Sequence, residues 1–353
     1  MSEPPASTPE VPVDANGLPD TLGISRPSDT EDEKRYVELI EGVVRGTITP
    51  SAAAKEMDKI VRESNDRAYG RDFERIHFKY IDHRDERELA SDASTWQTCL
   101  WYSIGRASSV IPANHSGQEL LIQLLEDLTC LPKHTIAYFT LSDEEIYEEL
   151  WTLSREDGYR LFPECLTVIH NDLLDFRRID DMDQSRVDQK ARAAFINFTT
   201  LSARLVGAHL VNVLILSPLT SKIFWDKHQS VTPEYTSAVL AAAQWILHAG
   251  IDMLEMCLRN AQDGPFTYSM EHWARWRIIF LDITAHNSGF IPEARRAASE
   301  SLEIMTEAEL DAERDDYEDE PSIIDAFGLE TIDDYTHQED VLEAVEALRG
   351  LEV

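Results

Sequence analysis

The chain has 353 residues, and its 66 Asp and Glu outnumber its 32 Lys and Arg to give a formal net charge of −34 at pH 7. This charge argues against direct binding of nucleic acid, where Lys and Arg contacts to phosphates supply much of the affinity, and against an anionic membrane surface. With only 4 Cys, a disulfide scaffold is excluded, whereas a hydrophobic fraction of 43% is enough for a sizeable core.

The first residues lack the basic and apolar regions of a signal peptide. The longest strongly apolar stretch, residues 205–216, is shorter than the roughly 20 residues that span a bilayer, so it predicts a buried core helix. We therefore expect a cytoplasmic or nuclear protein without a membrane partner. The cysteines, each in an apolar helical context and expected to act as a small hydrophobe, are Cys99, Cys130, Cys165 and Cys257.

Residues 1–30 contain six of the 15 prolines and few large apolar residues, so we expect this segment to be disordered. From residue 31 onward, helical periodicity and helix start signals follow one another. Helices are expected from Glu31 behind the N-cap Thr30, from Pro50 behind Thr49, over 92–111, after Ser116, over 161–177 and 186–216, from Thr232 to about 260, after Ser269, and from Pro292 into the acidic tail.

Residues 142–145 form a capping box, which predicts a further helix carrying Ile146, Leu150 and Trp151. No convincing alternation of polar and β-branched residues is present, so no strand is expected. The predicted fold is all-α: a single irregular multi-helix domain over residues 31–300, with a disordered N-terminus and an acidic tail over residues 301–353.

The acidic tail holds one further predicted element. Residues 300–353 contain twenty acidic and two basic residues, a net charge of −18. Within them, residues 337–349 follow a capping box and form a short amphipathic helix. Such a helix gains most by docking in a hydrophobic groove, either of a partner or of this protein's own core. Its apolar face consists of Val341, Leu342, Val345 and Leu348.

The sequence lacks the glycine-rich phosphate loops, the GxSxG elbow and the HExxH zinc motif. One ExxH, from Glu74 to His77, is present, but a di-iron bundle needs a second one and more Glu residues, so a solvated helix face is favoured. We therefore predict neither a metal nor a cofactor, and no catalytic residue is assigned.

The run from Trp273 to Arg277 is the most chemically distinctive stretch, because Arg beside Trp can stack on the ring or hold an anion. Arg204 lies in a strongly apolar helix, and a buried Arg needs a partner for its charge. Two interpretations are open: structural ion pairs with acidic residues of the fold, which we favour, or a pocket for an anionic small molecule. The candidate residues are Arg204, Trp245, Trp273, Trp276 and Arg277.

Five short motifs occur in a characteristic order over residues 36–285. They are residues 46–54 (GTITPSAAA), Leu100-Trp101 through Ile111-Pro112 to His115, Asn197 through Arg204, residues 241–246 (AAAQWI), and Phe266 through Trp276-Arg277. In this order they resemble a family of fungal proteins catalogued as a domain of unknown function. The resemblance implies an all-helical intracellular protein with no established activity.

The leading functional hypothesis is a non-enzymatic scaffold or protein-interaction module with an unidentified protein partner. One alternative is a small-molecule binder or enzyme with an Arg- and Trp-lined pocket between helices. The other is a transcriptional co-regulator that acts through its tail, since acidic residues and hydrophobic residues alternate there. Arg204 and Arg277 discriminate the first two, because the scaffold hypothesis requires both to be paired with acids of the fold.

Overall fold

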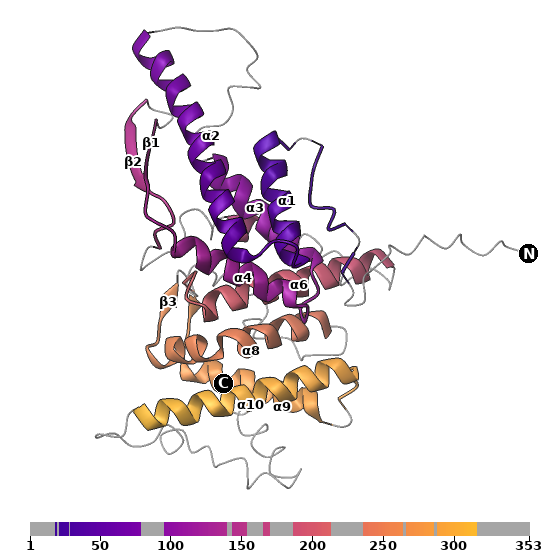
Figure 1. Ribbon diagram of the computed structural model, residues 1–353. Helices are drawn as coiled ribbons and strands as arrows, with labels where there is room; N and C mark the ends of the chain where they lie inside the picture. Colours follow the sequence, from indigo (N-terminus) through magenta and orange to yellow (C-terminus); the bar gives the residue numbers. More distant parts are fainter. Residues whose placement is uncertain are drawn as a thin grey trace, which may run out of the picture. The chain divides into compact units, whose positions relative to one another are not determined.

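The computed structural model describes residues 18–19, 21–27, 29–78, 95–139, 143–153, 165–169, 186–212, 236–263, 266–285 and 288–315. Helices dominate these residues, which confirms the all-α prediction (Figure 1). The chain divides into two compact units, residues 1–226 and 227–353. We call these two parts unit 1 and unit 2. The boundary between them falls within the core that was expected over residues 31–300.

The described part of unit 1 is built on five long helices, and predicted start signals explain how the first two begin. Thr30 forms the predicted capping box with Glu33, and the Thr49 hydroxyl accepts a bond from the amide of Ala52 at the start of the second helix. Helix α2 packs on α4, α3 packs on α6, and α1 contacts both α3 and α4. The helices are α1 (Glu31–Val44), α2 (Pro50–Phe78), α3 (Thr95–Val110), α4 (Ser116–Thr129) and α6 (Arg186–Gly207).

The N-cap of α4 differs from the expectation by one residue. His115, rather than Ser116, occupies the N-cap, and its Nδ1 accepts a bond of 2.8 Å from the amide of Gly117. A Cβ added at Gly117 would lie 2.8 Å from Val44 and 2.9 Å from His115, so the first turn of α4 has no room for a side chain at this position.

A β-hairpin replaces the helix predicted after residues 142–145, so that prediction is wrong. Strand β1 (Thr135–Phe139) pairs antiparallel with β2 (Glu145–Glu149). Strand β1 is rich in β-branched and aromatic residues, which fit a pleated surface, and it packs against α2. This packing outweighs a local capping signal that is only a few residues long.

The N-terminal segment also differs from the expectation. Leu18, Leu22 and Ile24 are buried, so the described part of residues 18–29 packs on unit 1 instead of remaining free. Three apolar side chains among prolines are few, but they bury enough surface to hold the segment. Residues 1–17 lie outside the described part of the chain.

The described part of unit 2 contains three helices and a hairpin of two short strands. Helix α8 (Thr236–Leu258) packs on α10 (Pro292–Asp315) and on α9 (Met270–Thr284), and β3 (Gln262–Asp263) pairs with β4 (Phe266–Thr267). Ser269 caps α9 and Pro292 opens α10, as predicted. The packed core continues beyond residue 300, because α10 buries Leu302, Met305, Ala308 and Glu309. The predicted boundary at residue 301 therefore lies within α10, the helix that was expected to run from Pro292 into the acidic tail.

Other predicted bounds are only partly covered by the structure. Of the helix expected over 161–177, residues 165–169 are described and are helical. The helix expected over 186–216 ends at Gly207. The tail helix at 337–349, with Val341, Leu342, Val345 and Leu348, lies outside the described residues, so its docking remains a prediction.

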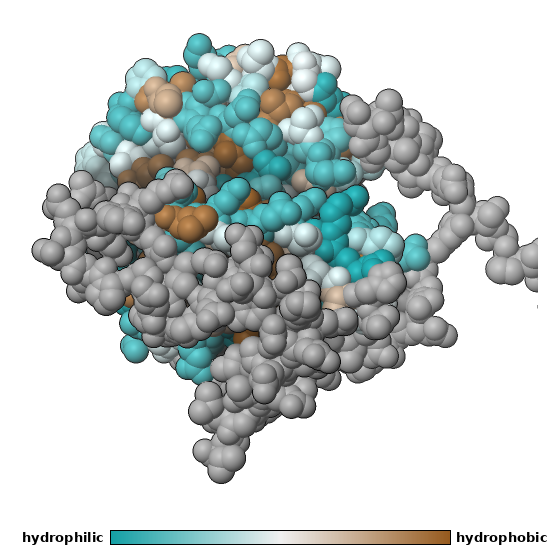
Figure 2. Space-filling model, turned by 90° about the horizontal axis from the view of Figure 1, so that it is seen from below, coloured by the Kyte–Doolittle hydropathy of each residue, from teal (hydrophilic) through white to brown (hydrophobic). Residues whose placement is uncertain are grey.

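Among the described residues, one helix is long and apolar enough to cross a membrane by length and composition. This is α8, and 56% of its apolar window is buried inside the structure. The core helix of a soluble protein passes the same test, so α8 is weak support for a membrane span. In Figure 2, hydrophobic residues on the described surface form small clusters among hydrophilic ones.

Candidate functional site

Trp273 and Arg277 lie one turn apart on α9, and both bind the carboxylate of Glu309 on α10. Trp273 Nε1 donates to Glu309 Oε1 at 2.7 Å, and Arg277 Nη1 donates to Glu309 Oε2 at 2.7 Å. The Arg277 side chain is 14% exposed and that of Glu309 is 8% exposed. Each carboxylate oxygen thus has a donor, and the buried positive charge is neutralised inside the fold.

Trp276 and Trp245 belong to the core of unit 2. Trp276 packs edge-on against Trp273, with ring centroids 6.1 Å apart, and against Tyr268 at 6.4 Å. Trp245 on α8 is fully buried among small residues. Among the described residues, its Nε1 has no hydrogen-bond partner. Both rings therefore act as apolar packing groups in the described part of unit 2.

Arg204 lies in unit 1, whereas the four other candidates lie in unit 2. Its Nη1 forms an ion pair of 2.6 Å with Glu119 Oε2 on α4, which ties α6 to α4. The pair is half open to solvent, because the side chain of Glu119 is 52% exposed and that of Arg204 is 22% exposed. Arg204 Nε is buried and makes no hydrogen bond to the described residues. The positive charge of Arg204 is nevertheless paired with Glu119 within the fold.

A second carboxylate cluster, which the sequence analysis missed, lies at the base of the hairpin in unit 1. Trp151 Nε1 donates to Asp58 Oδ1 at 2.8 Å, and Arg62 Nε donates to Asp58 Oδ2 at 2.9 Å. Lys133 Nζ donates to the Trp151 carbonyl at 2.5 Å. Trp151 has a φ of 57°, which is an uncommon conformation for a bulky residue. These bonds fix the hairpin to α2.

A third polar group joins the N-terminal segment to α1 and α3. Arg106 on α3 lies 3.7 Å from Asp29. Burial lowers the pKa of Arg106, and the nearby Asp29 carboxylate opposes that shift. Burial, together with a hydrogen bond to Glu33, raises the pKa of the Cys99 thiol well above its usual value. Cys99 is therefore a neutral thiol at pH 7 and lacks the thiolate character of a nucleophile.

Amide side chains join α3, α4 and α6 in the interior of unit 1. Gln118 is fully buried, and its Nε2 donates to the carbonyls of Ser108, Ile111 and Asn197. Asn197 Oδ1 accepts a bond of 2.9 Å from the amide of Ala113. The network satisfies main-chain groups at the end of α3, which is a structural task.

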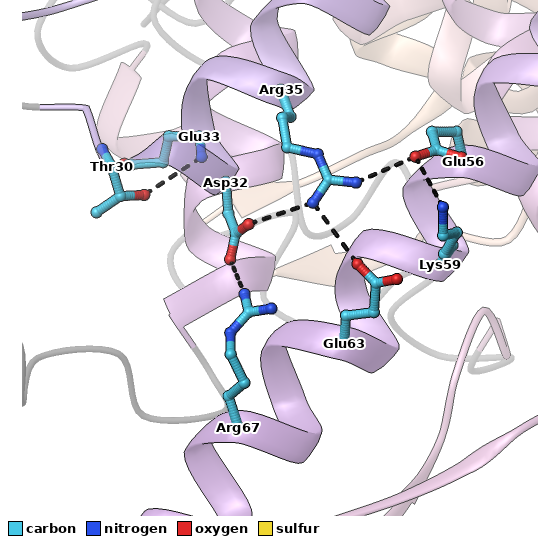
Figure 3. A network of polar contacts seen from close by, with 8 residues as sticks. All are labelled: Thr30, Asp32, Glu33, Arg35, Glu56, Lys59, Glu63 and Arg67. Carbon is cyan, nitrogen blue, oxygen red and sulfur yellow. Dashed lines mark hydrogen bonds and ion pairs between the residues drawn. The ribbon is translucent and has the colours of Figure 1, made fainter.

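The ion pairs between α1 and α2 form a surface network (Figure 3). Arg35 contacts Asp32, Glu56 and Glu63, and Arg67 binds Asp32. Most of these side chains are between a quarter and two-thirds exposed, so each pair contributes little stability. The network orients α1 on α2 and presents no unpaired charge to a ligand.

Within the described ranges, no group of three or more His, Cys, Asp or Glu side chains lies close enough to hold a metal ion. The ExxH residue His77 stacks on Phe73 with ring centroids 4.1 Å apart. The arrangement matches the solvated helix face that we favoured for this motif. Ser269 Oγ lies 2.8 Å from His272 Nδ1, but the same hydroxyl accepts a bond from the amide of His272 as the N-cap of α9. This Ser and His pair therefore serves to cap the helix.

Comparison with known proteins gives a family but no activity. No curated protein and no solved structure matches the chain. A family model described as a protein of unknown function (DUF3632) matches residues 101–280. Four of the five quoted motifs fall wholly or largely within this range, and the motif at 46–54 lies before it. The match covers just over half of the chain, which therefore belongs to the DUF3632 family.

Proposed function

We propose that this protein is a non-enzymatic scaffold or protein-interaction module of the cytoplasm or nucleus, and that its partner is another protein. The observation that supports this proposal best is the state of the two candidate arginines. Arg277 is paired with Glu309 and Arg204 with Glu119, both acids of the fold. A pocket for an anionic ligand would hold at least one of these charges ready for the ligand.

Two polar clusters support the same proposal. In both, a buried carboxylate has its hydrogen bonds filled by a Trp and an Arg, at Glu309 and at Asp58. Catalytic carboxylates commonly lie in clefts, have perturbed pKa values and keep an oxygen available to the substrate. Here the carboxylates hold helices and the hairpin together.

The tail helix at 337–349 is the proposed docking element. The test is affinity purification of the full-length protein from its own cells, comparing the native chain with a variant carrying Leu342→Asp and Leu348→Asp. The proposal expects a defined protein partner with the native chain and its loss with the variant, because two charges disrupt an apolar docking face. An unchanged far-ultraviolet circular dichroism spectrum serves as the folding control.

A matched control replaces two exposed acids, Glu303→Gln and Glu307→Gln, on α10. This control changes the charge near the tail without touching its apolar face, so it should retain the partner. Equal recovery of the partner with the native chain and the tail variant would contradict a role for this helix.

A further inference from the structure

The register of the β1–β2 hairpin determines which main-chain groups point toward the paired strand and which point outward, away from it. The amide of Leu150 donates to the carbonyl of His134 at 2.8 Å, directly beyond the pair Thr135–Glu149. In an antiparallel ladder, bonded and non-bonded pairs alternate. The pairs 136–148 and 138–146 therefore exchange hydrogen bonds, whereas the amides and carbonyls of residues 145, 147 and 149 point away from β1.

The outer edges of β1 and β2 differ in what covers them. On the β1 side, Asn65 Nδ2 of α2 donates to the Ala137 carbonyl at 3.0 Å, and Tyr69 stacks on Phe139 with ring centroids 5.3 Å apart. Helix α2 thus covers the edge of β1. Strand β2 lies on the far side of β1 from α2 (Figure 1). No main-chain bond joins Glu145, Tyr147 or Glu149 to a described residue outside β1.

The outward residues of β2 are exposed and carry a distinctive set of side chains. Tyr147 is 66% exposed and stands between Glu145 and Glu149, both of which are also exposed. The Glu145 carboxylate accepts bonds from Tyr147 at 2.9 Å and from Tyr69 at 2.8 Å, which orders this surface. β2 contains neither Lys nor Pro, and its charged residues are all Glu, so this edge repels acidic strands and attracts basic ones.

The hairpin is held rigidly at its base. Trp151, directly after β2, is fixed by Asp58 of α2 through its ring and by Lys133 through its carbonyl. A strand that is already ordered loses little conformational entropy when another strand pairs with it. The β2 edge is therefore prepared for pairing before any partner arrives.

We propose that the outer edge of β2 binds an extended, basic segment of a partner protein by strand addition. This inference rests on the proposed interaction role and names the kind of partner. Main-chain bonds to residues 145, 147 and 149 provide the pairing, and alternate Lys or Arg side chains of the partner lie beside Glu145 and Glu149. The protein's own residues 300–353, with a net charge of −18 from twenty acidic and two basic residues, have the wrong sign for this edge.

The test measures binding of a fluorescent peptide of eight alternating Lys and Val residues to the full-length protein by anisotropy. A charge-reversed variant, Glu145→Lys with Glu149→Lys, should bind at least about tenfold more weakly, since both charge pairs become repulsive. The matched control, Glu303→Lys with Glu307→Lys, changes the net charge equally on exposed sites of unit 2 and should bind like the native chain.

Two further probes test the backbone pairing itself. Tyr147→Pro removes an outward amide without removing a ladder bond and should weaken binding, whereas Tyr147→Thr retains the amide and should bind more tightly than the proline variant. A peptide N-methylated on the Lys residues and one N-methylated on the Val residues should differ strongly, because only one alternate set of amides faces β2.

No binding of the native chain to the unmethylated peptide would overturn the proposal. Equal weakening by both variants with reversed charges would also overturn it, because it would indicate general electrostatic attraction. Equal effects of the two methylation patterns would exclude strand addition. These outcomes are separate from the proposed function, since the tail variant with Leu342→Asp and Leu348→Asp leaves the β2 edge intact.

Discussion

The two units each contain a buried carboxylate that is bound by one Trp and one Arg, but the surroundings of the two clusters differ. In unit 2, Arg277 and Glu309 are both largely buried, with side chains 14% and 8% exposed. In unit 1, Asp58 is buried at 7%, but Arg62 is 44% exposed. The two clusters therefore share the same kinds of hydrogen bond but differ in burial. In unit 2 both members of the ion pair are largely buried, whereas in unit 1 the buried Asp58 binds a partly hydrated Arg62.

The connections differ as well. In unit 2, the Trp and the Arg lie on one helix and bind a second helix, so the cluster joins α9 to α10. In unit 1, Arg62 and Asp58 lie on α2, and Trp151 comes from the end of the hairpin. Loss of the carboxylate should affect helix packing in unit 2 and attachment of the hairpin in unit 1.

The largest expected effect is at Glu309. Glu309→Ala leaves the Arg277 charge buried without its partner, which should cost about 3–5 kcal/mol of the opening free energy of unit 2. The measurement is hydrogen exchange of α9 and α10. Glu307→Ala, on the same helix but exposed, should change that energy by less than about 0.5 kcal/mol. Equal effects of the two substitutions would mean that the buried pair contributes nothing.

Asp58→Ala should have a smaller effect. Arg62 remains hydrated, so the main loss is the hydrogen bond of the buried Trp151 Nε1, which costs about 1–3 kcal/mol. Hydrogen exchange should rise in β1 and β2 more than in α4. Asp66→Ala, an exposed acid on the same helix, is the control. Unaltered protection of the hairpin would remove Asp58 as its attachment point.

A pair of Trp substitutions sharpens the comparison within unit 2. Trp273→Phe and Trp245→Phe remove similar ring volume, but only Trp273 loses a hydrogen bond to a carboxylate. Trp273→Phe should therefore cost about 1.5–3 kcal/mol more in the free energy of unfolding measured with urea. A larger cost at Trp245 would indicate that its Nε1 has a polar role that the described residues do not explain.

The smallest effect concerns thiol reactivity and leaves stability unchanged. Cys130 at the end of α4 is exposed, whereas Cys257 is buried. Burial raises the pKa of Cys257 in unit 2 to about 12, so its thiolate is scarce at pH 8. A disulfide reagent at pH 8 should label Cys130 rapidly and Cys257 only upon unfolding. Cys130→Ser should remove the rapid phase, and a rapid phase that persists would contradict the assignment.

Sequence reasoning succeeded where the determinants are local. Thr30, Thr49, Ser269 and Pro292 mark helix starts through contacts within a few residues, and the structure has those helices. It also singled out the run from Trp273 to Arg277, because Arg beside Trp can stack on the ring or hold an anion. A local combination of residue types therefore pointed to one of the two carboxylate clusters, although not to its acid.

The missing parts depend on contacts between distant segments. Glu309 was assigned to the acidic tail over residues 301–353, although α10 buries it against α9. Asp58 and Trp151 are 93 positions apart, and the hairpin that brings them together was predicted as a helix. No local pattern carries this information, because packing of β1 on α2 decides it.

The central claim is that the buried charges stabilise the fold and that the binding partner of this chain is another protein. Native mass spectrometry of the full-length protein isolated from its own cells tests this claim most directly. The account predicts a noncovalent protein complex that the variant with Leu342→Asp and Leu348→Asp loses, and that a folded Arg277→Met, Glu309→Gln variant retains. A stoichiometric small-molecule adduct on the native chain that is lost in the Arg277→Met, Glu309→Gln variant would contradict it.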